Sequence, residues 1–272
     1  MYFSHCISNE SQKKRGMKMK ILKLDFYKIF QKKGYLVCIG AVVLFVLSSA
    51  FAYSGATDDE LNFLLQDFNA MKYIWLASTD ILYQGTTLFS LMLLGIILSN
   101  LYLEDFKNGC YKYVIIAGVK KKSFFVGKVL FTSLIVGSFV VFAFLCVTIV
   151  GIIFWGTDGI NLKEFLDAFL LYIVTIIPMV SFLFLLYDIA LIIKNVRVIN
   201  FIAVVLPLIL GIVDSLSITK NFSPIGLLTI FNQSPPTEYI PHISQYLVIE
   251  VLWLAFFVIM NYIIQKQYQD TM

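Results

Sequence analysis

The side chains that commonly catalyse reactions or bind metals do not fall at catalytic spacings in this sequence. Its histidines are His5 and His242, and neither has a carboxylate or a cysteine at ligand spacing. Gly127 and Lys128 end like a G-x-x-x-x-G-K-[ST] phosphate-binding loop, but valine follows them and the glycine five residues earlier is missing. The H-E-x-x-H and G-x-S-x-G motifs are missing as well. We therefore expect no catalytic residue, no metal site and no cofactor in this chain.

The four cysteines offer no second route to a metal or redox site. Cys6, Cys38, Cys110 and Cys146 show no C-x-x-C spacing, and two of them lie inside apolar runs. Neither a disulfide framework nor a zinc site follows from such a pattern.

Polar residues inside long apolar runs are the candidates for a translocation path, and they are Gln84, Asp188, Glu250 and Asn261. A polar side chain is costly in hydrocarbon, so one that is kept there marks a substrate pathway or the interior of a helix bundle. Asp188 and Glu250 lie near the ends of their runs, and snorkelling to the membrane interface is the alternative interpretation for both.

The composition that surrounds these residues is that of a membrane protein. Of the 272 residues 59% are hydrophobic and 14% charged, whereas a soluble domain has roughly 45–50% apolar and about 25% charged residues. The apolar residues form runs near 35–53, 81–103, 129–155, 168–193, 198–213 and 246–264. Each run must be helical, because backbone groups in hydrocarbon have to be hydrogen-bonded within the segment and the runs lack barrel alternation. We predict an all-α, polytopic membrane protein with six transmembrane helices.

The basic residues predict the orientation of these spans. All but Lys72, Lys163 and Lys220 of the 21 basic residues lie before the first span, between spans two and three or four and five, or after the last. Because short loops rich in lysine and arginine stay in the cytoplasm, both termini should be cytoplasmic. The net charge of +4 is then a topology signal and predicts no nucleic-acid partner. Only Arg15 and Arg197 are arginines, a bias that fits a bacterial cell membrane protein from an AT-rich genome.

The N-terminal segment, residues 1–34, should hold an interfacial amphipathic helix. Between residues 20 and 33 the apolar Leu22, Phe26, Ile29 and Phe30 share one helical face, with lysines elsewhere. A charged flank that only sets topology is the alternative. Residues before Met17 or Met19 are unlike the rest and suggest an upstream extension. A six-helix transmembrane domain, 35–264, and a cytoplasmic tail, 265–272, follow.

Two further segments allow more than one interpretation. Ala50-Phe51-Ala52 resembles a signal-peptide cleavage site, but the basic region before it is too long and five more spans follow. The outer segment 214–245 contains an apolar stretch behind Ser223 and Pro224, a helix-start signal. It predicts a short helix in the outer leaflet, or else a loop patch packed on neighbouring helices.

The connection between spans two and three carries a recognisable pattern. An acid is followed four residues later by a glycine, then by a short helical stretch, a glycine turn, a basic residue and a final lysine. The residues in these places are Asp105, Gly109, Gly118, Lys121 and Lys128. The pattern resembles that of the ABC-2 permease family. Two residues depart from the family pattern: Cys110 stands where threonine is usual, and Lys121 where arginine is usual. The competing interpretation is a positive-inside loop with incidental spacing.

The resemblance implies a permease subunit that pairs with a second copy or a paralogue in the lipid membrane. ATP and Mg would be bound by a separate ABC ATPase, coupled through Asp105, Gly109, Cys110, Gly118, Lys121 and Lys128. Similar small permeases serve antimicrobial-peptide export, lantibiotic immunity, bacitracin-type resistance and sodium efflux.

The aromatic content of 16% favours a hydrophobic or amphipathic peptide over sodium as the substrate. An ATP-independent secondary transporter or channel is the rival class. It would show matching broken helices in two repeats, a symmetry that the sequence does not display.

Overall fold

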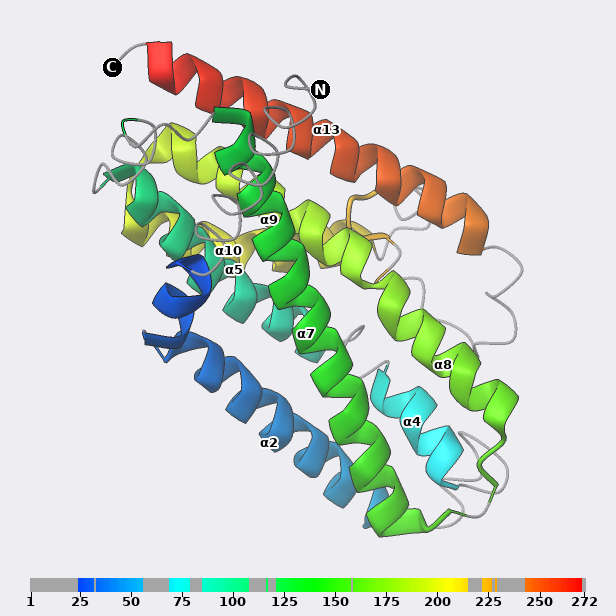
Figure 1. The fold of residues 1–272 in the computed structure, drawn as a ribbon. Helices are drawn as coiled ribbons and strands as arrows, with labels where there is room; N and C mark the ends of the chain where they lie inside the picture. Colours follow the sequence, from blue (N-terminus) through cyan, green and yellow to red (C-terminus); the bar gives the residue numbers. More distant parts are fainter. Residues whose placement is uncertain are drawn as a thin grey trace, which may run out of the picture.

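The computed structural model describes residues 24–31, 33–55, 69–78, 85–107, 116, 121–157, 159–214, 222–226, 228 and 243–270. Within these residues the chain is a bundle of α-helices without strands, as predicted (Figure 1). Its labelled helices are α2 (Gly34–Ser54), α4 (Ala70–Ser78), α5 (Gly85–Lys107), α7 (Lys121–Trp155), α8 (Leu162–Val174), α9 (Ile176–Ile193), α10 (Val196–Asp214) and α13 (Ile243–Asp270). Residues 24–31 form a further helix before α2.

Five stretches of the described chain are long and apolar enough to cross a membrane: α2, α7, the joined α8 and α9, α10, and α13. They confirm a polytopic all-α membrane protein. The second predicted span, 81–103, corresponds to α5, which has 23 residues but is not among these five. The count of six therefore stays a prediction.

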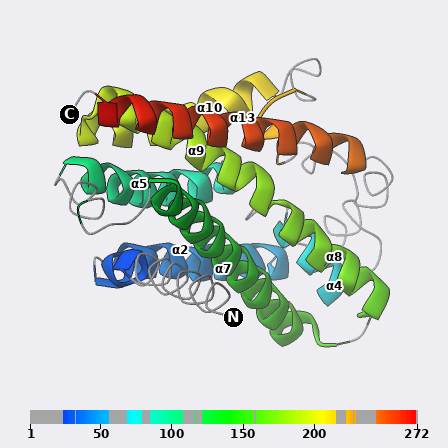
Figure 2. The same cartoon turned by 45° about the horizontal axis from the view of Figure 1, so that its top comes forward.

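The fourth predicted span consists of two helices in line rather than one (Figures 1 and 2). Pro178 stands in the first turn of α9 and has no N–H to donate to the carbonyl four residues earlier. The Thr175 hydroxyl, between the helices, donates to the Tyr172 carbonyl at 2.6 Å. Thr175 and Pro178 thus mark the break between α8 and α9.

Helix α7 is the longest element and runs diagonally across the molecule (Figure 2). Its 35 residues correspond to about 52 Å at 1.5 Å per residue. It packs against α2, α4, α8 and α9. It begins at Lys121, eight residues before the predicted third span, so it extends into the segment that carries the family pattern.

Helix α4 lies in a region predicted only as an outer loop. It packs between α2, α7 and α8, and Met71, Tyr73 and Ile74 are fully buried. The Tyr73 hydroxyl donates to the Val46 carbonyl at 2.9 Å, and a Cβ at Gly151 would lie only 3.0 Å from the Tyr73 ring. The small residue at 151 therefore lets α4 approach α7 closely.

The described part of the outer segment 214–245 is packed on the bundle. The Ser223 hydroxyl accepts the Ile225 N–H at 3.3 Å, a contact that a helix start at this serine predicts. Ile225 and Leu228 are 1% and 3% exposed. The burial of both side chains fits the alternative of a loop patch packed on neighbouring helices.

Candidate functional site

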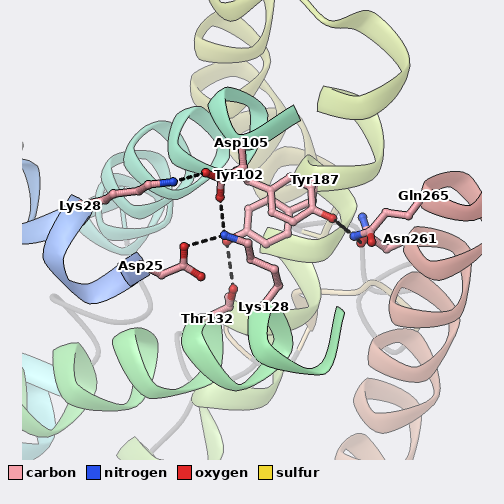
Figure 3. Close-up of polar contacts among 9 residues, drawn as sticks. All are labelled: Asp25, Lys28, Tyr102, Asp105, Lys128, Thr132, Tyr187, Asn261 and Gln265. Atoms are coloured by element: carbon pink, nitrogen blue, oxygen red, sulfur yellow. Dashed lines mark hydrogen bonds and ion pairs between the residues drawn. The ribbon is translucent and has the colours of Figure 1, made fainter. Parts of the chain in front are cut away.

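A buried charge cluster joins the N-terminal helix to α5 and α7. It consists of Asp25, Lys28, Asp105 and Lys128 (Figure 3). Asp105 lies in the last turn of α5 and Lys128 in the second turn of α7, and the two form an ion pair. Their side chains are 4% and 3% exposed. The two ends of the segment with the family pattern are therefore held together inside the protein.

The helix over residues 24–31 supplies the other two members of the cluster. Lys128 Nζ donates to Asp25 Oδ1 at 2.8 Å, and Lys28 pairs with Asp105. Asp25 and Lys28 are three residues apart, so both project from one face of their helix. Lys28, expected on the polar face, is thus turned towards the bundle. Two carboxylates and two ammonium groups balance each other, which reduces the cost of burying them.

The two carboxylates of the cluster have different environments. Burial raises the pKa of Asp25 above its usual value, and Lys128 offsets this only in part. Burial also acts to raise the pKa of Asp105, but Lys128 and Lys28 outweigh it and hold that pKa below its usual range. Asp25 Oδ2 has no hydrogen-bond partner among the residues that the structure describes. Asp105 is consequently the firmly ionised carboxylate, and Asp25 is the one that takes up a proton first.

A chain of polar and aromatic contacts leads from the cluster across the bundle. Thr132, one turn after Lys128, lies 3.1 Å from the Tyr187 hydroxyl of α9. The Tyr187 ring stacks on Tyr102 of α5, with centroids 4.1 Å apart and 3° between the planes. Figure 3 shows the two rings between the charge cluster and α13.

This series of contacts ends in a buried cluster of four polar side chains around two side-chain amides, called the amide group below: Tyr102, Asp188, Asn261 and Gln265. The Tyr102 hydroxyl donates to Asn261 Oδ1 at 2.6 Å, and Asn261 Nδ2 donates to Asp188 Oδ1 at 2.7 Å. Gln265 Nε2 donates to Asn261 Oδ1 at 2.9 Å and also to the Tyr102 hydroxyl. Satisfied in this way, the polar atoms join α5, α9 and α13 within an apolar core.

The structure brings together two of the residues predicted for ATPase coupling, Asp105 and Lys128. Lys121 is the first residue of α7. Gly109, Cys110 and Gly118 lie outside the described residues. The coupling role of this set stays a prediction.

Of the four candidates for a translocation path, Asp188 and Asn261 contact each other in the amide group. Glu250 is 1% exposed and lies eleven residues before Asn261 on α13. That spacing is about three helical turns, so both side chains lie on the same face of the helix. Gln84 lies outside the described residues. The structure places Asp188 and Asn261 at a contact between α9 and α13, and the role of all four residues in translocation stays a prediction.

Sequence reasoning missed several residues of the site: Asp25, Tyr102, Tyr187 and Gln265. Asp25 had a signal, because it is the single acid between residues 11 and 57 in a strongly basic region. The two tyrosines and Gln265 had none, since each is an ordinary residue for a helix end or a membrane interface. In the described part of the chain, no group of three His, Cys, Asp or Glu side chains is placed to hold a metal ion.

Comparison with known protein families gives a match. The family model described as ABC-2 family transporter protein matches residues 21–214, which is most of the chain. The matched region runs from the N-terminal helix to the end of α10 and contains the whole charge cluster. Neither a curated protein nor a solved structure matches the chain.

Proposed function

The chain belongs to the ABC-2 transporter family, and on that premise we propose that it is a permease driven by a separate ATPase chain. The permease would assemble with a second copy of itself or a paralogue. ATP and Mg would be bound by the partner, because this sequence has no phosphate-binding loop. Segment 105–128 would receive the ATPase on the cytoplasmic side.

The observation that carries this proposal is the buried pair between Asp105 and Lys128. A loop that served only as a topology signal would need exposed lysines and no fixed geometry. Here the two ends of the segment are ion-paired within the bundle, and both are residues of the family pattern. A partner that pushes or pulls on the segment would therefore act on α5 and α7 together.

Helix α7 offers the path for such a movement. It begins at Lys121, inside the segment, and continues without a break to Trp155. Near its far end it packs against α4 and α8. A rigid helix of about 52 Å would carry a displacement from the ATPase side to the opposite side of the membrane.

For the substrate we favour a hydrophobic or amphipathic peptide that is exported. The aromatic content supports this choice, as do the charges of the cluster, which pair with one another. The amide group likewise satisfies its own polar atoms. An apolar bundle of this kind suits an amphipathic solute better than a strongly hydrated ion.

The test is purification of the permease with the ATPase encoded beside it, followed by reconstitution in liposomes. We expect ATP hydrolysis that a cationic amphipathic peptide stimulates. Stimulation by sodium chloride but not by the peptide would replace peptide export with sodium efflux. Failure of any ATPase to co-purify, or ATP hydrolysis by the permease alone, would refute the proposal.

A companion variant, Lys121→Gln, addresses the segment itself. It removes one charge at the start of α7, where the family has a basic residue. We expect normal membrane insertion with reduced stimulation of ATP hydrolysis by the peptide. Lys122→Gln is the matched control, since it removes the same charge one residue later from an exposed side chain. If the peptide stimulates ATP hydrolysis equally in both variants, the segment is a topology signal only.

A further inference from the structure

We infer that Asp25 and Lys28 are positioning residues for the coupling segment, which the N-terminal helix holds in place through the Asp105–Lys128 pair. This inference rests on the proposed function and goes beyond the family pattern, which begins at Asp105. It assigns the helix over 24–31 a role in coupling. The predicted roles of this helix were membrane attachment and a topology signal.

The four members of the cluster contact one another in a linear order. The charges alternate along a chain from Asp25 to Lys128, then Asp105, then Lys28. The two inner members close the segment, and the two outer members both come from the N-terminal helix. This helix therefore holds the pair at both of its ends, one contact on α7 and one on α5 (Figure 3).

Apolar contacts dock the same helix on the bundle. Ile29 is 1% exposed, and the Phe26 ring meets Phe131 of α7 edge to face, with centroids 5.3 Å apart. These contacts supply attachment without any charge. The buried ions are thus not needed to hold the helix, and their cost indicates a more specific task.

The turn that connects this helix to the first span has a constrained backbone. Lys33 lies between the helix and α2 and has φ 54°, in the left-handed region. Its N–H donates to the Phe30 carbonyl at 3.1 Å, which closes a tight turn. Because a non-glycine residue adopts this conformation only when its surroundings impose it, the direction of the helix relative to α2 is set. A movement of the segment would be passed to α2 by this route.

A positioning role of Asp25 and Lys28 can be separated from a role in folding, because variants of both residues should fold. Asp25→Asn leaves Lys128 paired with Asp105 and removes a carboxylate whose burial is unfavourable. Lys28→Gln leaves the inner pair untouched, and its side chain is 23% exposed and able to reach solvent. Both variants should fold and insert, while the Asp105–Lys128 pair loses one of its two contacts with the N-terminal helix.

The experiment uses the complete transporter, purified with its ATPase and reconstituted in liposomes. For both variants we expect kcat of ATP hydrolysis to fall at least about fivefold, the lower range of coupling between sites. The KM for ATP should not change, since nucleotide binds in the partner. Asp25→Glu and Lys28→Arg, which keep the charges, should retain a higher kcat than Asp25→Asn and Lys28→Gln. Glu164→Gln, which neutralises an exposed acid in the first turn of α8, is the control and should behave like the wild type.

Three results would overturn the inference. Wild-type kcat in both variants would overturn the inference while leaving the proposed function intact, because the wild-type complex would still couple. Loss of folding in Asp25→Asn would overturn it too, since Asp25 would then be structural. If the wild-type chain binds no ATPase at all, the proposed function fails first and the inference fails with it.

Discussion

Replacing Lys128 by methionine should be far more damaging than replacing any exposed lysine of the same segment. The Lys128 side chain is 3% exposed and lies between two carboxylates that are 2% and 4% exposed. In Lys128→Met, Asp105 keeps its pair with Lys28. Asp25 loses its hydrogen-bond donor, because its one such contact in the described part of the chain is with Lys128.

The size of the effect follows from this burial. Removing one partner of a buried ion pair costs about 3–5 kcal/mol, because the other charge is left uncompensated. At about 2–4 °C per kcal/mol for a domain of this size, the unfolding midpoint should fall by about 6–20 °C. Removing a surface charge changes stability by about 0–1 kcal/mol.

The assay is thermal unfolding of the detergent-purified chain, with Lys122→Met as the matched control. Lys122 is exposed, lies on the same helix, and its loss removes the same charge from the same side of the membrane. A common midpoint for the two variants would refute the reasoning.

A second mutation makes the test more specific. Adding Asp25→Asn to Lys128→Met removes the stranded carboxylate, so most of the lost stability should return. Adding Asp105→Asn instead leaves Asp25 stranded and should return little. If Asp105→Asn rescues as well as Asp25→Asn does, then the described contacts do not identify the stranded group.

Three other predictions concern pH, topology and packing. The folded-state pKa of Asp25 is raised, so its ionised form costs stability at neutral pH and the cost disappears as the pH falls through that pKa. The wild type should therefore gain stability relative to Asp25→Asn between about pH 7 and about pH 4.5, and a relative loss contradicts the sign. Single cysteines should label from outside at Lys163 and only after permeabilisation at Lys121, and the reverse pattern would invert the topology. Gly95→Val should lower the unfolding midpoint, since a Cβ there would lie 2.8 Å from a buried leucine of α9, at a cost of about 1–3 kcal/mol. Gly40→Val, where no atom lies within 4 Å, should not, and equal midpoints would contradict the packing.

The helices themselves were predictable from the sequence because their hydrogen bonds are local. A run of about 20 apolar residues in lipid has to satisfy its backbone within itself, so its composition determines both its type and its length. The predicted first span, 35–53, differs from α2 by one residue at each end, and the predicted fifth, 198–213, differs little from α10. The break between α8 and α9 was missed, although Pro178 is visible in the sequence, because the apolar run continues through it.

Helix α4 was missed for a different reason. Its nine residues are too few to cross a membrane and lie in a polar surrounding, so no rule about span length applies to them. Its burial depends on the space that α2, α7 and α8 leave between them. That space exists only after the longer helices have packed.

Asp105 and Lys128 were recognised from the resemblance of their segment to the family pattern, but their pairing with each other, and with the N-terminal helix, was not. Lys128 and Asp25 are 103 residues apart in the chain, and Tyr102 and Asn261 are 159 apart. Periodicity reports which side of a helix is apolar, and it carries no information about which polar side chain of a distant helix will meet it. The membrane setting and the helices were thus determined by local composition. The charge cluster and the amide group were decided by how the helices pack, because a buried charge is tolerated only where packing brings it a partner.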